Sequence, residues 1–235
     1  MLQRLNHARE LLRTGSKDDV AKALDVFEEV TRQDPGNFEA NVRAAQILLQ
    51  SEVTTHEEEH ALLKRVIDHL SLAKQIRPES SFVWHLASWT RYRRFEVLRE
   101  LTDIHKAIEF AETAMKRAEE MMDIHGALQA KICLAWKLQI RAEWSGKTSA
   151  ADLALAAELC RDVSNYVRRA QGTLLSDYLY THAIVRLAQG DQDHDDIEKM
   201  IQEAEQHDQW NGKLEIATNK LRLARSPKRP RPQIL

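Results

Sequence analysis

The segment His56–His60 has the sequence His-Glu-Glu-Glu-His, which satisfies the H-E-x-x-H pattern of zinc-dependent proteases. On a helix, His56 and His60 would lie on one face and could ligate zinc, with Glu57 as the general base. In the longer form of this motif a glycine and a third histidine follow, but Leu63 and Val66 occupy those positions here. The pattern therefore supplies only part of a catalytic zinc site.

The same segment has the features of a helix N-terminus. Thr55 is a suitable N-cap residue, and Glu58 stands three positions later, where a capping box places its acidic partner. Three consecutive glutamates also complement the positive end of the helix dipole. We therefore expect His56 and His60 to be exposed at a helix start, and we predict no metal and no cofactor. A zinc-dependent hydrolase through these histidines is a less favoured alternative.

The acidic segment Asp191–Asp196 is similar to the start of a calcium-binding loop. Asp196 stands at the position that requires glycine, however, and Gln202 stands where a bidentate acid is needed. We interpret the segment as a turn followed by a helix N-cap. The sequence also lacks a phosphate-binding glycine loop and a Gly-x-Ser-x-Gly elbow. These observations favour a protein that is not an enzyme.

The composition favours helices and a near-neutral surface. The 235 residues include only 7 Gly and 5 Pro, too few for the frequent tight turns of a sandwich or barrel. Lys and Arg (34) nearly balance Asp and Glu (36), so no overall field attracts nucleic acid or an anionic membrane.

Two local clusters are basic, and both could contact phosphate or an acidic peptide. They could equally be a solvated helix end and a disordered tail. A nucleic-acid-binding solenoid is therefore an alternative, weakened by the formal net charge of −2. The clusters are Arg91, Arg93, Arg94 and Arg99, and the segment Lys228–Arg231.

The cysteines and the hydropathy of the chain indicate the cellular compartment. Cys133 and Cys160 each lie among apolar helical residues, which is typical of small core residues in a reducing compartment. Residues Met1–Glu10 carry charges throughout, unlike a signal peptide. No apolar run approaches the roughly 18 residues of a membrane-spanning helix. We predict a cytoplasmic protein without membrane contact.

Apolar residues recur with helical spacing along most of the chain, and short segments rich in turn formers interrupt them. Two of these interruptions contain proline, at Asp34–Asn37 and Arg77–Pro78, and others contain glycine. Short breaks make consecutive helices antiparallel neighbours. The sequence therefore predicts an all-α fold, an α-solenoid of about five antiparallel helix pairs.

The two ends of the chain are expected to differ from its middle. A last helix over residues 212–224 would cap the exposed end of the stack, as repeat arrays require. Residues 1–225 would then form one helical repeat domain. Residues 226–235, basic and rich in proline, are expected to be a disordered tail.

The second helices of the first pairs share one spacing of small and apolar residues. Two of these segments begin 12 positions before a proline, Pro35 or Pro78. This spacing resembles the second helix of the tetratricopeptide repeat. The three matching segments are Ala23–Val30, Val66–Ala73 and Ala107–Ala114.

The resemblance covers about residues 1–125 and is divergent. The family's small eighth position in the first helix falls on Ala45 and Ser88, and its fourth-position tryptophan falls on Trp84. Successive second helices follow one another at 41 to 49 residues, whereas the family period is about 34. The HEAT class, with a period of about 40, therefore stays open.

The resemblance implies a protein-binding groove lined by the first helices. Its groove positions give an aromatic stripe that ends in a guanidinium, the composition of a binding hot spot. Alternatively, the central tryptophan packs between repeats, as aromatic stripes at helical spacing usually do. Trp84 would lie on another face, in the core. The five groove residues are Phe82, His85, Trp89, Tyr92 and Arg93.

From the resemblance we expect a non-enzymatic interaction module: an adaptor, a scaffold or the regulatory subunit of a complex, binding a partner protein or peptide through its concave face. A ligand- or peptide-sensing solenoid that uses Phe82, Trp89 and Tyr92 is the main alternative. The family's clamp for a C-terminal carboxylate is not recognisable, because Arg43 and Leu86 stand at two of its positions.

Overall fold

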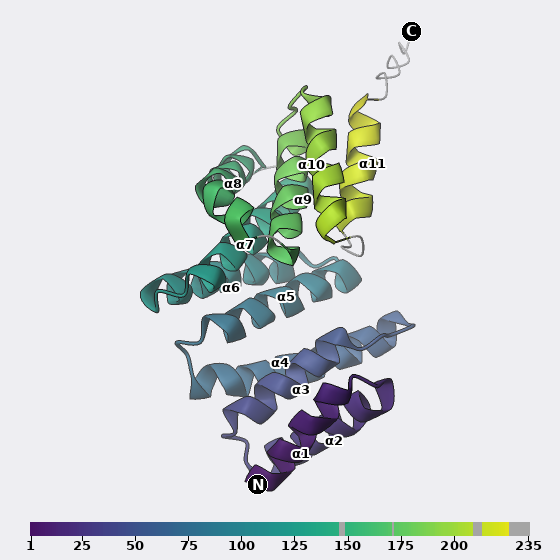
Figure 1. The fold of residues 1–235 in the computed structure, drawn as a ribbon, viewed down its shortest axis with the longest axis vertical. Coiled ribbons are helices and arrows are strands. Elements are labelled where there is room, and N and C mark those ends of the chain that lie inside the picture. The colour runs from purple at the N-terminus through teal and green to yellow at the C-terminus, as the bar shows by residue number, and fades with distance from the viewer. Residues whose placement is uncertain (146–148, 171, 209–212, 226–235) are drawn as a thin grey trace. The chain divides into compact units, whose positions relative to one another are not determined.

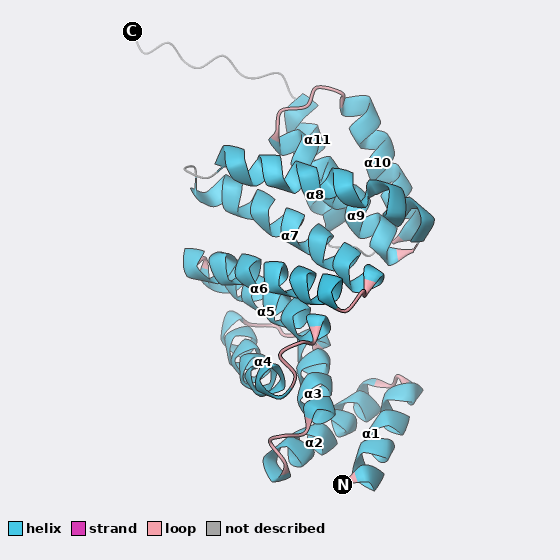
Figure 2. Ribbon diagram, turned by 90° about the vertical axis from the view of Figure 1, so that its left-hand side faces the viewer, coloured by secondary structure: helices cyan, strands magenta, loops and turns pink. Residues whose placement is uncertain are grey.

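The computed structural model describes residues 1–145, 149–170, 172–208 and 213–225, and these residues form eleven helices and no strand (Figures 1 and 2). The predicted all-α class is confirmed. The helices are α1 (Leu2–Thr14), α2 (Lys17–Gln33), α3 (Phe38–Gln50), α4 (His56–Ile76), α5 (Ser81–Leu98), α6 (Leu101–Glu120), α7 (Ile124–Ser145), α8 (Ser149–Ala170), α9 (Thr173–Ala188), α10 (His194–His207) and α11 (Lys213–Arg225).

The chain divides into two compact units, residues 1–130 and 131–235, and the division falls within α7. In the first unit, α1 packs on α2, α3 on α4, and α5 on α6, and each pair also contacts the next (Figure 1). This succession of contacting pairs is the solenoid-like arrangement that the sequence predicts.

Local signals set the ends of the helices in the first unit. Helix α2 ends at Asp34, whose backbone N–H bonds to the carbonyl oxygen of Val30 at 2.8 Å, and Pro35 follows. Helix α4 ends in the same way at Arg77, before Pro78. Both proline junctions lie between helix pairs, as predicted, because proline cannot continue the preceding helix.

The core of the first unit is built from small side chains where helices approach closely. Ala23, Ala45 and Ala107 are fully buried, and Ala111 is nearly so. Ser88 is also buried, and its hydroxyl donates a hydrogen bond to the carbonyl oxygen of Ala107 at 2.6 Å. Because this bond joins α5 to the backbone of α6, the small residues bring the two helices into direct contact.

In the second unit, α9 is the central helix, and α8, α10 and α11 all pack against it. Its residues Leu179, Ala183 and Ile184 are fully buried. Cys160 of α8 is buried as well, and burial raises the pKa of its thiol to about 12, so it is a core residue as predicted. The predicted tail, residues 226–235, lies outside the described residues.

Candidate binding surface on helix α5

Helix α5 begins after Ser80 and ends at Arg99, which adopts a left-handed conformation (φ 56°) and donates its N–H to the carbonyl oxygen of Phe95. Apolar residues are spread around this helix, whereas in α2 and α6 they gather on one face. An amphipathic helix buries its apolar face and exposes a polar one. Helix α5 packs against α4 as well as α6, so apolar residues are buried on more than one of its sides, while Phe82 and Trp89 stay exposed.

Three of the predicted groove residues lie at the surface of α5. Phe82 is 42% exposed, Trp89 is 36% exposed, and His85 between them is half-buried. Their spacing of three and four residues places them on one side of the helix. We call Phe82, His85 and Trp89 the α5 surface.

The prediction that Tyr92 lines the groove is not supported by its position. Tyr92 is only 5% exposed, and its hydroxyl donates to the carboxylate of Glu96 at 2.8 Å. Burial raises the pKa of Glu96, while the hydrogen bond from Tyr92 opposes that shift. The Tyr92 ring lies 5.6 Å from the ring of Trp89, centre to centre. Tyr92 therefore belongs to the core beneath Trp89.

Arg93 joins three helices. Its guanidinium Nη2 lies 2.7 Å from the Glu59 carboxylate of α4, and its Nη1 donates to the Leu49 carbonyl oxygen of α3 at 2.8 Å. Both charged side chains are largely buried. The guanidinium that was expected to bind a partner thus fixes α5 against the preceding pair.

Trp84 lies on the opposite side of α5 and is half-buried, less completely than its expected core position implies. Its indole N–H donates to the carbonyl oxygen of Pro78 at 2.8 Å, and its ring lies 5.4 Å from that of Phe110 on α6. Trp84 therefore connects α5 to the α4–α5 junction and to α6.

The basic cluster of α5 is neutralised by neighbouring carboxylates. Asp103 of α6 is 1% exposed, and it lies 3.0 Å from Arg91 Nη1 and 2.9 Å from Arg94 Nε. Arg94 also lies 3.6 Å from Glu100. These pairs hold α5 against α6, which removes most of the positive charge that could have attracted nucleic acid.

An exposed apolar turn that the sequence analysis missed lies beside the start of α5. Met121, Met122 and Ile124 are 62%, 86% and 69% exposed. The Asp123 carboxylate lies 3.5 Å from the hydroxyl of Ser81, the neighbour of Phe82. In the sequence the apolar spacing of this segment continues to Met122, but α6 ends at Glu120 and leaves Met122 at the surface.

The zinc-like segment forms the start of α4. Thr55 is the N-cap, and its side chain and that of Glu58 form the predicted capping box. His56 and His60 are both exposed, as expected. Within the described ranges, no three potential ligand side chains are grouped so that they could hold a metal ion.

The other acidic segment also has the predicted structure. Asp193 is the N-cap of α10, and its carboxylate accepts from the N–H of Asp196 at 3.1 Å. Arg186 of α9 lies 2.7 Å from the Asp191 carboxylate, and it also pairs with Asp196. The carboxylates of this calcium-loop-like segment thus accept from a backbone N–H group or pair with an arginine.

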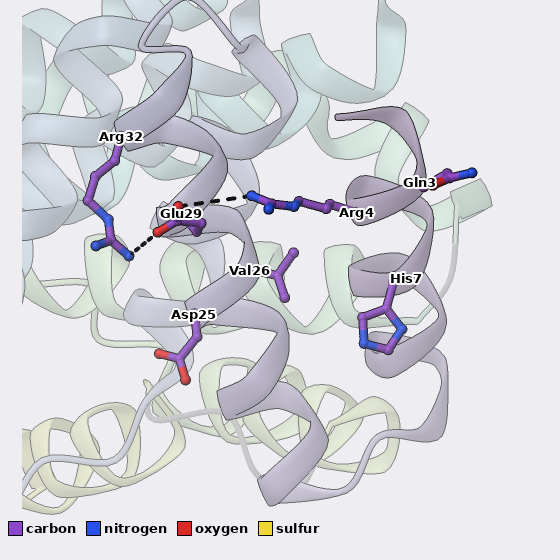
Figure 3. Close-up of a pocket in the computed structure, with 7 residues that line it drawn as sticks. All are labelled: Gln3, Arg4, His7, Asp25, Val26, Glu29 and Arg32. Carbon is purple, nitrogen blue, oxygen red and sulfur yellow. Dashed lines mark ion pairs between the residues drawn. The ribbon is translucent and has the colours of Figure 1, made fainter.

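A pocket opens on the first helix pair between α1 and α2 (Figure 3). Three of its charged residues pair with one another, since Glu29 lies 2.8 Å from Arg32 and 3.9 Å from Arg4. Val26 is the one apolar residue that lines it, and it is half-buried. The residues that line the pocket are therefore mostly polar or charged.

The second unit contains a buried lysine that the sequence analysis did not single out. Lys137 of α7 is fully buried, and burial lowers the pKa of its amine. Its Nζ lies 3.4 Å from the carbonyl oxygen of Cys133. The nearby Lys213 lies 3.0 Å from Asp177 and 3.2 Å from the Thr181 hydroxyl. The signal was a lysine within the apolar run of α7.

A tyrosine and a histidine of α9 also remain uncharged in the second unit. The Tyr178 hydroxyl and His182 Nδ1 are 3.1 Å apart. Burial lowers the pKa of His182 to about 4 and raises that of Tyr178 to about 12. Both groups are therefore neutral near pH 7, and a hydrogen bond between two neutral groups is compatible with their position at the edge of the core.

No model of a known protein family matches this sequence, and no curated protein matches it either. In the described part of the chain, every helix is too short or too polar to cross a membrane.

Proposed function

We propose that this protein is a non-enzymatic interaction module, an adaptor, scaffold or regulatory subunit, that binds a partner protein or peptide segment through the α5 surface. The observation that carries the proposal is the exposure of two large aromatic rings, Phe82 and Trp89, on one side of a helix whose other sides are packed. Exposed aromatic residues at the centre of a packed surface are characteristic of binding hot spots.

The residues around the α5 surface support a rigid site. Arg93 bonds to α3 and α4, and Ser88 bonds to the backbone of α6. Tyr92 packs beneath Trp89. A partner that docks on Phe82 and Trp89 would therefore meet side chains whose backbone is already fixed, which lowers the entropic cost of binding.

We also propose that the first unit is a divergent tetratricopeptide-like array. The buried small residues of its second helices and the proline junctions between pairs support this assignment. A solenoid presents an extended surface from successive first helices, and α5 would supply the aromatic part of it.

A cytoplasmic location fits this function. Cys133 and Cys160, the two cysteines of the chain, are not joined in a disulfide. Thiols in this state are typical of proteins from a reducing compartment.

Site-specific photo-crosslinking in the native cells would test the binding surface. A photoreactive amino acid at His85, between the two exposed rings, is expected to form a covalent adduct with one partner protein. The matched control is the same amino acid at His105, an exposed histidine of α6. Adducts should form at His85 and not at His105, and the Trp89→Ala substitution should abolish them.

Two outcomes would contradict the proposal. The first is the same adducts from His85 and His105, which would indicate non-specific contact. The second is a His85 adduct that persists at full yield when Trp89 is replaced by alanine, which would place the partner elsewhere.

A further inference from the structure

A small hollow lies between α4, α5 and α6, on the side of α5 opposite the exposed Trp89. Ser71 and Lys74 line it from α4, Arg91 from α5 and Phe110 from α6. Ser71 and Lys74 are three residues apart on their helix, so they share a face. We call this site the α4–α6 hollow.

Lys74 is a half-buried cation at this hollow that forms no ion pair among the described residues, and the Glu109 carboxylate acts on it only through its charge. Its Nζ lies 4.4 Å from the ring centre of Phe110 and 5.0 Å from that of Trp84. The two rings fix the direction of the side chain and favour its charged form. Burial lowers the pKa of the Lys74 amine, the charge of Arg91 lowers it further, and the charge of Glu109 opposes this shift.

Two further donors line the same hollow. The Ser71 hydroxyl bonds to no acceptor within the described residues. Arg91 donates from Nη1 to Asp103 at 3.0 Å, which leaves Nε and Nη2 without an acceptor in that part of the chain. Donors from two helices therefore line one space.

We propose that the α4–α6 hollow binds a small oxyanion, a carboxylate or phosphate group in free solution, through Lys74, Ser71 and the remaining donors of Arg91. Two adjacent cations and a hydroxyl are the groups that such an anion accepts from. The volume inside the hollow that the centre of a water molecule could occupy is about 30 Å³. One water needs roughly 10–15 Å³ of such space, so two anionic oxygens fit and a nucleotide does not.

This site is independent of the binding surface proposed above. Trp89 and Arg91 are two positions apart on α5, which places their side chains on different faces of the helix. Loss of partner binding at the α5 surface would therefore leave anion binding intact, and the reverse also holds.

Titration of the full chain with inorganic phosphate, and separately with acetate, would test the proposal. The readout is the NMR resonance of the Trp84 indole N–H, whose ring lies 5.0 Å from Lys74 Nζ. Sodium chloride keeps the ionic strength constant in both titrations. We expect saturable shifts with at least one anion, with a Kd on the order of 1 mM.

Three variants make the test specific. Lys74→Gln should weaken binding by roughly tenfold or more, because it removes a charge-assisted hydrogen bond. Ser71→Ala, a smaller change, should weaken it by a few-fold. Lys64→Gln removes an exposed lysine from the same helix and should leave binding unchanged. Wild-type unfolding behaviour of Ser71→Ala confirms that its effect is local.

The proposal is overturned if neither phosphate nor acetate shifts the resonance. It is also overturned if Lys74→Gln and Lys64→Gln weaken binding equally, since the effect would then be general charge screening. A response to acetate but not phosphate would assign the site to planar carboxylates.

Discussion

The two sides of helix α5 differ in how their aromatic and polar groups are used. On the inner side, the Trp84 indole bonds to Pro78, and Arg91 pairs with Asp103. On the outer side, Phe82 and Trp89 expose 42% and 36% of their surface. The inner groups each hold a neighbouring element in place, whereas the outer rings present a large part of their surface to solvent.

This difference distinguishes residues that stabilise the fold through contacts from residues that the fold leaves at the surface. A helix needs one apolar side to pack in an antiparallel pair. Helix α5 satisfies that need with its inner side, and its outer rings add exposed apolar area at a cost in solubility. Under the proposed function the aromatic pair on the outer side serves binding, so substitutions on the two sides should have different effects.

The largest loss of stability is expected from Trp84→Ala, on the inner side. It removes the contact with Phe110 and the hydrogen bond to Pro78, and we expect it to lower the free energy of unfolding by about 2–4 kcal/mol. Denaturant unfolding followed by circular dichroism measures this. Trp84→Phe keeps a ring and should cost less. A Trp84→Ala variant as stable as wild type would show that the inner side does not hold the pair together.

The next effect is expected where α6 meets α5. Ala111 is 1% exposed, so Ala111→Leu should overpack the interface and lower the free energy of unfolding by about 1–3 kcal/mol. The control is Ala21→Leu, at an exposed alanine of α2, which should change stability by no more than about 0.5 kcal/mol. Equal thermal melting of the two variants would contradict close packing at Ala111.

A smaller effect is expected from Arg93→Gln. This change removes the pair with Glu59 and the bond to Leu49, both largely shielded from water, and should cost about 1–2 kcal/mol in unfolding free energy. Arg32→Gln is the matched control, because Arg32 is 72% exposed in its pair with Glu29 and should contribute little. If Arg93→Gln has full stability but binds the partner poorly, Arg93 belongs to the binding surface after all.

The parts of the structure that depend on neighbouring residues in the sequence were predictable. Proline at positions 35 and 78 ends α2 and α4, and the capping box of Thr55 and Glu58 starts α4. These signals act within one helical turn, so one sequence suffices to find them.

The parts that depend on distant residues were not predictable. Arg93 was assigned to the groove, but its partners Glu59 and Leu49 lie 34 and 44 positions away in the sequence. Tyr92 shares the stripe of Trp89, three positions away, yet its side chain is only 5% exposed. Helical spacing indicates which residues share a side, but packing between pairs decides how far that side is exposed.

The most direct test of the account compares Trp89→Ala with wild type in two measurements on the same protein: affinity for the crosslinked partner by calorimetry, and free energy of unfolding. We predict that the Kd rises by about 30-fold or more, as for a hot-spot residue, while stability falls by only about 1–2 kcal/mol. An unchanged Kd would contradict the account, and so would a variant that no longer folds, because Trp89 would then be part of the core.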